Sequence, residues 1–216
     1  KAGGPLYLSR LLSRRPKGWL EFRGPDAARA AGLAYGEWLR AKGFTAEASR
    51  CAGYVARSAI GGGAELNGPV GERNLYELHG RGRVLLLPQT RTGLLLQLGA
   101  VLATGNSAAV DAPPELAELL RGLPPALAAR VRTTADWRDV GPLAAVLVEG
   151  DRERVTAVNR RVAELPGPIL LVQAASAEAL AAGRGEGYDL DLLLNERSIS
   201  VNTAAAGGNA SLVAMS

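Results

Sequence analysis

Side chains that most often carry nucleophilic or metal chemistry are scarce in this chain. Its 216 residues include one cysteine, Cys51, and one histidine, His79, far apart in the sequence. A usual zinc site needs four ligands at short spacings, and an activated nucleophile needs a base beside it. The composition therefore predicts no metal centre and no Ser-His-Asp or Cys-His set. Because Cys51 lies in a helix-like run and has no disulfide partner, we expect a buried, inert thiol.

Phosphate and nucleic-acid binding are only weakly indicated. The run Gly61-Gly62-Gly63 has a helix-like segment before it and no clear helix after it, so it lacks the strand–loop–helix context of a phosphate cradle. The net charge is +4, and aromatic residues make up 5%. A basic nucleic-acid-binding module remains an alternative, but such patches usually combine more charge on one face with interleaved aromatics. The one dense basic group is interpreted as a solvated helix face: Arg10, Arg14, Arg15 and Lys17.

The apolar pattern predicts the elements that would position any site. Strands that are apolar throughout alternate with helices, which is typical of a parallel sheet covered on both faces. We therefore expect an α/β fold with a Rossmann-like layer over residues 74–173, a helical lead-in, and a separate strand at 198–202. Trp38 and Tyr54 are expected to pack between the first two helices. Helices are expected at 26–42, 45–57, 92–103, 114–121, 126–132 and 151–164, and strands at 72–79, 83–87, 107–110, 143–148 and 169–173.

Residues 198–212 are the most distinctive stretch. They begin with alternating Ser and Ile/Val, as in a strand, and continue as Asn-Thr-Ala-Ala-Ala-Gly-Gly-Asn-Ala-Ser-Leu. A segment with so little side-chain volume can lie flat in a groove and be held by main-chain hydrogen bonds. A frayed chain end is the alternative interpretation. This stretch resembles the terminal motif of the long members of the proline utilization A family, bifunctional flavoenzymes that oxidise proline to glutamate.

The resemblance implies roles at both ends of the chain. The opening residues are similar to the end of a loop that holds the substrate carboxylate in the semialdehyde dehydrogenase part of that family, and Ala2 and Gly3 match it. The terminal motif implies a lid over the cavity that passes the intermediate between the two active sites. The residues it assigns to the lid and domain interface are Ser198, Ser200, Asn202, Thr203, Ala204, Ala205, Ala206, Gly207, Gly208 and Asn209.

The middle of the chain is similar to the aldehyde dehydrogenase superfamily, with its cofactor positions altered. After Gly-Asn, active members carry a lysine that binds the adenosine ribose of NAD, and Asp111 stands there in this chain. Active members also carry Phe-Thr-Gly-Ser at the helix that faces the pyrophosphate. Here Glu149 and Asp151 flank Gly150, and Val155 replaces a second glycine. Carboxylates at a helix N-terminus occupy the place of a phosphate, and a like-charge pair at about 4 Å costs about 4 kcal/mol at an effective dielectric constant of 20.

Together these similarities imply a catalytically silent copy of the dehydrogenase fold. We expect residues 1–24 to end the semialdehyde dehydrogenase domain, 25–195 to form the degenerate domain with a lead-in over 25–70, and 196–216 to form the strand and lid. Lys1 at the start suggests a chain cut from a longer one.

The implied parent is a cytoplasmic, oligomeric enzyme that uses FAD and NAD, associates peripherally with the membrane to reduce quinone, and packs this region on its two catalytic domains. No apolar run reaches membrane-spanning length. An autonomous NAD-binding domain without catalysis is the alternative.

Overall fold

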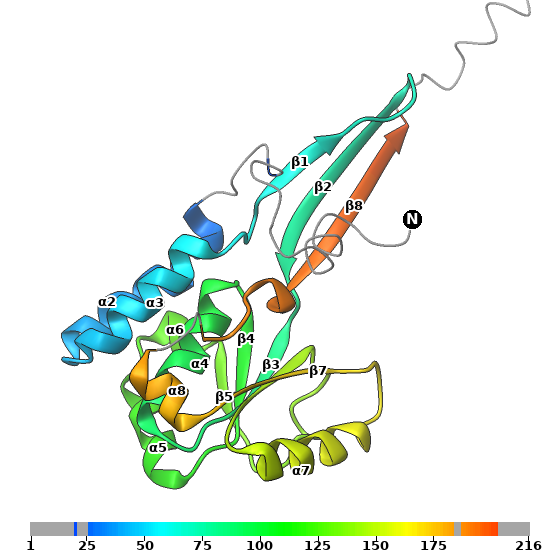
Figure 1. Ribbon diagram of the computed structural model, residues 1–216. Helices are drawn as coiled ribbons and strands as arrows, with labels where there is room; N and C mark the ends of the chain where they lie inside the picture. Colours follow the sequence, from blue (N-terminus) through cyan, green and yellow to red (C-terminus); the bar gives the residue numbers. More distant parts are fainter. Residues whose placement is uncertain (1–19, 21–25, 184–186, 203–216) are drawn as a thin grey trace, which may run out of the picture.

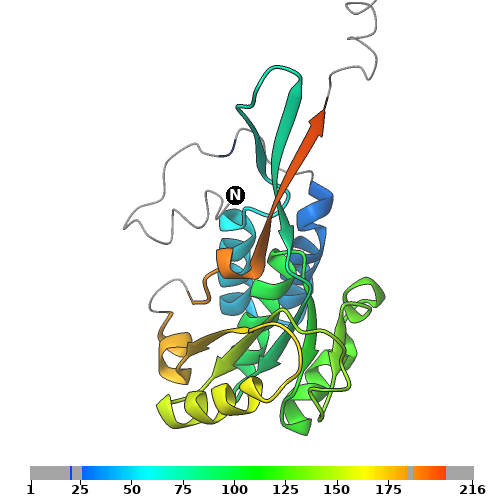
Figure 2. The same ribbon diagram turned by 90° about the vertical axis from the view of Figure 1, so that its right-hand side faces the viewer.

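The computed structural model describes residues 20, 26–183 and 187–202. Within these residues an α/β body carries an antiparallel arm that projects from one end, as both views show (Figures 1 and 2). The expected α/β class with a Rossmann-like parallel sheet and helices on both faces is confirmed. The expected bounds of that layer, 74–173, are wrong at the start: the parallel sheet begins at residue 83, because the strand expected at 72–79 pairs antiparallel in the arm. No helix among the described residues is long and apolar enough to cross a membrane.

A five-stranded parallel sheet forms the centre of the body, in the order β5-β4-β3-β6-β7. The central pair is apolar throughout because both of its faces are covered. Alternate residues point to opposite faces: Val84 and Leu86 join the core under α4, whereas Leu85 and Leu87 join the core under α7. The strands are β3 (Arg83–Leu87), β4 (Ser107–Val110), β5 (Val131–Thr133), β6 (Ala145–Glu149) and β7 (Leu171–Ala175).

The two faces of the sheet are covered unequally. α4 (Arg91–Ala103) is buried along nearly its whole length, because α2 (Asp26–Ala41) and α3 (Thr45–Arg57) pack over it. Trp38 stacks on Tyr35 and donates its indole N–H to the carbonyl of Gly122, and Tyr54 is 2% exposed, so both aromatic side chains are part of this core. α7 (Arg152–Ala163) lies on the other face and buries Val158 and Val162.

Several segments differ from the sequence-based expectation. Residues 63–66 form a strand and residues 177–182 a helix where no element was expected, and the strand expected at 143–148 is β6 at 145–149. The helix expected at 126–132 is a single turn, α6 (Pro125–Ala128), after which the chain becomes β5 because residues 131–133 pair with β4. The helix expected at 114–121 is α5 (Pro114–Glu118) followed by the 3-10 helix η1 (Leu119–Gly122). The strand expected at 169–173 begins two residues later, and Ile169 is 98% exposed, because β7 lies at the edge of the sheet.

The arm is a second sheet of three antiparallel strands in the order β1-β2-β8. These are β1 (Gly63–Leu66), β2 (Glu72–Gly80) and β8 (Leu194–Asn202), and β8 pairs with β2 along all of its length. The expected strand at 198–202 is confirmed and begins four residues earlier. The 3-10 helix η2 (Asp191–Leu193) leads into it from the body, after α8 (Ala177–Ala182). Ile60, Tyr76, Leu78 and Leu194 form the apolar base of the arm.

Candidate functional site

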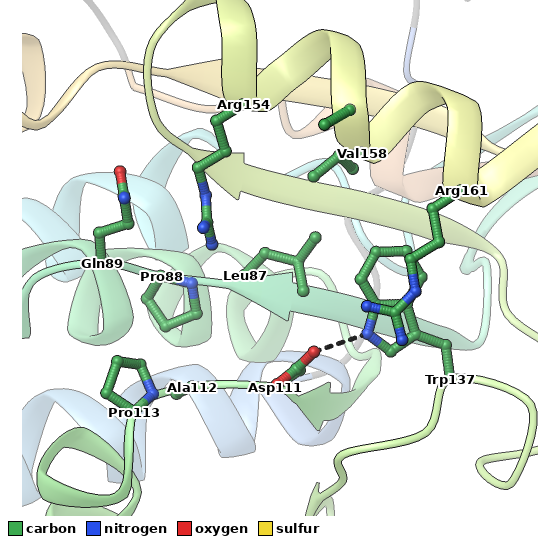
Figure 3. Close-up of a pocket in the computed structure, with 11 residues that line it drawn as sticks. Leu87, Pro88, Gln89, Asp111, Ala112, Pro113, Trp137, Arg154, Val158 and Arg161 are labelled. Carbon is green, nitrogen blue, oxygen red and sulfur yellow. Dashed lines mark hydrogen bonds between the residues drawn. The ribbon is translucent and has the colours of Figure 1, made fainter.

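The candidate site lies at the carboxyl ends of β3 and β6. These strands are neighbours, but the chain leaves β3 toward β4 and leaves β6 toward β7, on opposite sides. In open α/β sheets, ligands bind in the crevice at such a switch point. A pocket of about 600 Å³ opens here between α7 and the segment after β4 (Figure 3). Its lining is Leu87, Pro88, Gln89, Asp111, Ala112, Pro113, Trp137, Arg154, Ala157, Val158 and Arg161.

Glu149, at the end of β6, is fully buried and serves as an internal anion. Its Oε2 accepts hydrogen bonds from the backbone N–H groups of Gln89 (2.6 Å) and Thr90 (2.8 Å). Its Oε1 accepts from the Thr90 hydroxyl at 2.7 Å. These donors immediately precede α4, so the carboxylate occupies the helix N-terminus that elsewhere attracts phosphates.

The packing of Glu149 requires glycine at position 93. A Cβ atom built on Gly93 would lie 1.8 Å from Oε2 of Glu149, which is less than any van der Waals contact. Thr90 completes the turn, since its Oγ1 accepts from the N–H of Gly93 at 3.0 Å. Glu149 was expected at this edge, but Gly93 and Thr90 were not. The available signal was a glycine in the first turn of an otherwise leucine-rich helix.

Asp111 follows β4, and its carboxylate is directed at Trp137. Oδ2 accepts a hydrogen bond from the indole Nε1–H at 2.7 Å. The guanidinium of Arg161 lies over the same indole, with its central carbon 3.7 Å from the ring centroid (Figure 3). The three residues come from the segment after β4, the segment before β6, and α7. Sequence reasoning identified Asp111 through a family resemblance and had no motif for Trp137 or Arg161.

Asp151 and Arg154 cover the start of α7. The Asp151 side chain is the N-cap and accepts from the N–H of Arg154 at 2.9 Å. The aliphatic part of the Arg154 side chain folds over Gly150, since a Cβ added there would lie 2.5 Å from Cδ of Arg154. The structure thus places all four altered positions (Asp111, Glu149, Gly150 and Asp151) around one edge of the sheet.

Cys51 lies away from this site, in α3. It is 1% exposed and packs against α4, where a Cβ on Gly99 would lie 2.2 Å from its sulfur. Burial raises the pKa of the Cys51 thiol from its usual 9.0 to about 12. The expected buried thiol is therefore confirmed. The described residues contain no cluster of His, Cys, Asp and Glu suited to a metal ion.

Only part of the expected lid and interface can be located. Ser198, Ser200 and Asn202 lie on β8, where the Ser200 hydroxyl donates to Oδ1 of the buried Asn74 on β2. Val201 is 45% exposed. The expected anchor residues Ala2 and Gly3, the basic group at 10–17, and lid residues 203–209 lie outside the described residues.

No family model matches the chain. Among curated proteins, "Bifunctional protein PutA" of Rhizobium meliloti is 50% identical over an alignment of 220 residues, which covers all of this chain and 17% of that protein. The protein of the same name from Salmonella typhimurium is 38% identical over 228 residues, covering 99% of this chain and 17% of its own length. The chain thus spans about one sixth of the curated relatives it matches.

Solved structures agree in fold. A Bradyrhizobium japonicum proline utilization A mutant is 22% identical with a TM-score of 0.53, over 74% of this chain and 20% of that one. A further bifunctional proline utilization A structure is 23% identical with a TM-score of 0.52 over the same shares.

The sheet topology and its switch-point crevice define a Rossmann-like α/β module. The family resemblance noted in the sequence is confirmed: this module matches a segment of proline utilization A from end to end.

Proposed function

We propose that this chain is a non-catalytic region of a bifunctional enzyme that oxidises L-proline to L-glutamate. It supports the semialdehyde dehydrogenase domain of the same polypeptide and helps to seal the cavity through which the intermediate passes. The proposal draws on the match to proteins named bifunctional PutA and on the altered edge of the sheet. FAD and NAD belong to the other domains of the parent enzyme.

One observation carries the non-catalytic role: the fully buried Glu149 carboxylate accepts three hydrogen bonds at the N-terminus of α4. A dinucleotide that spans this edge would have to place its phosphates between that charge and the Asp111 carboxylate, which follows β4 on the other side of β3. The Arg154 side chain also covers Gly150, where a pyrophosphate would need bare backbone N–H groups. These residues do not fit a bound dinucleotide, and no redox step is assigned to them.

The arm supports the sealing role. β8 is at the edge of its sheet, and no further strand among the described residues pairs with its outer side. An open strand edge is a template for main-chain pairing with another surface. Asn202, its last residue, continues into the Ala/Gly-rich residues of the expected lid. A rigid sheet that ends in a thin segment could close a cavity wall without steric conflict.

Two measurements test the proposal. Deleting residues 202–216 from the parent enzyme is expected to lower coupled proline-to-glutamate turnover, while the rate on directly supplied semialdehyde changes less. Equal coupled rates in the truncated and intact enzymes would refute the sealing role. In a thermal-shift titration of the chain, NAD is expected to leave the midpoint unchanged, because only a ligand of the native state raises it. A saturable rise would favour the NAD-binding alternative instead.

A further inference from the structure

We propose that the pocket between α7 and the end of β4 binds a small aromatic anion, a flat ring that carries one phosphate or carboxylate group. This inference goes beyond the architectural role and does not depend on it. The pocket volume of about 600 Å³ lies within the range of small-molecule sites. Neither an oxidation nor a group transfer is involved, only binding.

The charge of the pocket is uneven between its two ends. At the Trp137 end, the Arg161 guanidinium and the Asp111 carboxylate offset one another around the indole. At the Gln89 end, the Arg154 side chain points from α7 toward Pro88 (Figure 3). No carboxylate among the described residues forms an ion pair with Arg154. The Glu149 carboxylate lies outside the pocket lining and accepts hydrogen bonds from the backbone N–H groups before α4. Asp151 likewise lies outside the pocket lining and accepts from the N–H of Arg154, so Arg154 is the one charged side chain of the described residues that lines this end.

Arg154 also has an unsatisfied donor. Its Nε is shielded from solvent and has no hydrogen-bond partner in the described part of the chain. Buried donors in native structures nearly always have a partner, so an orphaned one needs an explanation. Guanidinium groups match the geometry of phosphate and carboxylate oxygens, often in bidentate pairs. An acidic group bound at Arg154 would supply the missing acceptor.

The remaining walls favour a flat apolar body. Apolar residues make up much of the lining, among them Leu87, Pro113 and Val158. The indole of Trp137 is covered on one face by Arg161, and the outer face of that planar guanidinium is a surface on which a ring can stack. Asp111 would repel a second acidic group at this end. The arrangement therefore favours ligands with a single anionic head over dinucleotides.

The test is calorimetric titration of the full 216-residue chain with three matched probes. These are 2-naphthyl phosphate, 2-naphthoate and the neutral 2-naphthol, and NAD is added as a fourth. We expect the two anions to bind saturably and 2-naphthol at least about tenfold more weakly, since a hydrogen bond to a charged group is worth roughly that factor or more. The better of the two anions identifies the head group as phosphate or carboxylate. NAD is expected not to bind.

Variants link the binding to this pocket. Arg154→Met retains the aliphatic cover of Gly150 and should weaken anion binding by about tenfold to a hundredfold. Arg160→Met, on the exposed side of the same helix, makes the same charge change and should alter it by less than about twofold. Arg154→Lys retains a cation and should restore part of the affinity. If Arg154→Met does not fold, the Arg154→Lys variant and the 2-naphthol comparison decide. Equal affinities for the anions and 2-naphthol, equal losses at 154 and 160, or no anion binding would overturn the proposal.

Discussion

Oε2 of Glu149 lies only 1.8 Å from the point that a Cβ atom on residue 93 would occupy. The two residues are far apart in the sequence, on β6 and α4, and each restricts the other. The glutamate reaches the N–H groups before α4 only because residue 93 has no side chain. This pair is the most closely fitted contact at the candidate site, and it gives the first prediction.

Gly93→Ala should destabilise the chain by about 3 kcal/mol, because the new methyl group either displaces the carboxylate or strains the first turn of α4. Urea unfolding followed by circular dichroism measures the change in the free energy of unfolding. Gly36→Ala in α2 is the control, since no described atom lies within 4 Å of the added Cβ. A helical glycine changed to alanine there should be neutral or stabilising by up to about 1 kcal/mol. Similar losses at 93 and 36 would contradict the argument.

Glu149→Ala should cost about 3–5 kcal/mol, because it leaves two backbone N–H groups and the Thr90 hydroxyl without their acceptor in a buried site. Glu149→Gln should cost less, since its amide oxygen can still accept from both N–H groups. The exposed Glu164, at the end of α7, provides the control variant Glu164→Ala, which should change the free energy by less than about 0.5 kcal/mol. The same unfolding assay compares all three. An unaffected Glu149→Ala would show that the carboxylate contributes nothing to the fold.

Replacing Asp111 separates its hydrogen bond from its charge. Asp111→Ala leaves the Trp137 Nε1–H without an acceptor and should cost about 1–3 kcal/mol. Asp111→Asn keeps an oxygen acceptor of the same shape, so its cost should stay below about 1 kcal/mol. Indole fluorescence reports the local change and unfolding reports the stability. If both variants behave alike, the hydrogen bond to Trp137 is not what holds this wall of the pocket.

The buried thiol of Cys51 predicts a loss of stability at alkaline pH. Its pKa is raised from 9.0 to about 12 in the folded chain. Once the pH exceeds the thiol pKa of the unfolded chain, the unfolded chain loses this proton more readily than the folded chain, and unfolding becomes more favourable. The stability that the buried, protonated thiol contributes is fully present below pH 9 and is lost progressively as the pH rises toward 12. Tyr35, Tyr54 and Tyr188 have raised pKa values through burial and act in the same direction. The difference between wild type and Cys51→Ala isolates the thiol, and it should shrink between pH 9 and 11. A pH-independent difference would be inconsistent with this burial.

The sequence predicts the elements whose local pattern and tertiary role agree. β3 and β4 have the expected bounds because every residue after Arg83 at the start of β3 is apolar or small, and α3 because its spacing and the glycine before it mark a helix. β5 is missed because only three residues pair with β4, two of them exposed, so no periodicity reveals it. β7 begins later than expected because its pairing with β6 starts at Leu171, and the apolar Ile169 before it is exposed at the edge of the sheet.

The residues of the candidate site divide in the same way, into those with a local sequence pattern and those that only tertiary packing brings together. Family resemblance located Asp111 and residues 149–151, because those positions depart from a known motif. Arg154 lies within the altered motif, whereas Trp137 and Arg161 lie in segments without one, and only the packing of α7 across the sheet brings the three together. The fit of Gly93 to Glu149 depends on the distance between two elements, which no local pattern encodes.

The outer part of β8 provides the last prediction, because it distinguishes folding from docking. Val201 is 45% exposed near the end of the arm and faces Arg73 on β2, so Val201→Lys should cost less than about 1 kcal/mol in the free energy of unfolding of the chain. In the parent enzyme, if β8 lies against a neighbouring domain, the same lysine places a charge in that contact and should lower coupled proline-to-glutamate turnover several-fold. Ile169→Lys, at a 98% exposed position before β7 and away from the arm, makes the same charge change and should leave coupling intact. Steady-state formation of NADH from proline, with the rate on added semialdehyde as the reference, measures both. Unchanged coupling in Val201→Lys would place the exposed side of β8 in solvent and remove the arm from the sealing role.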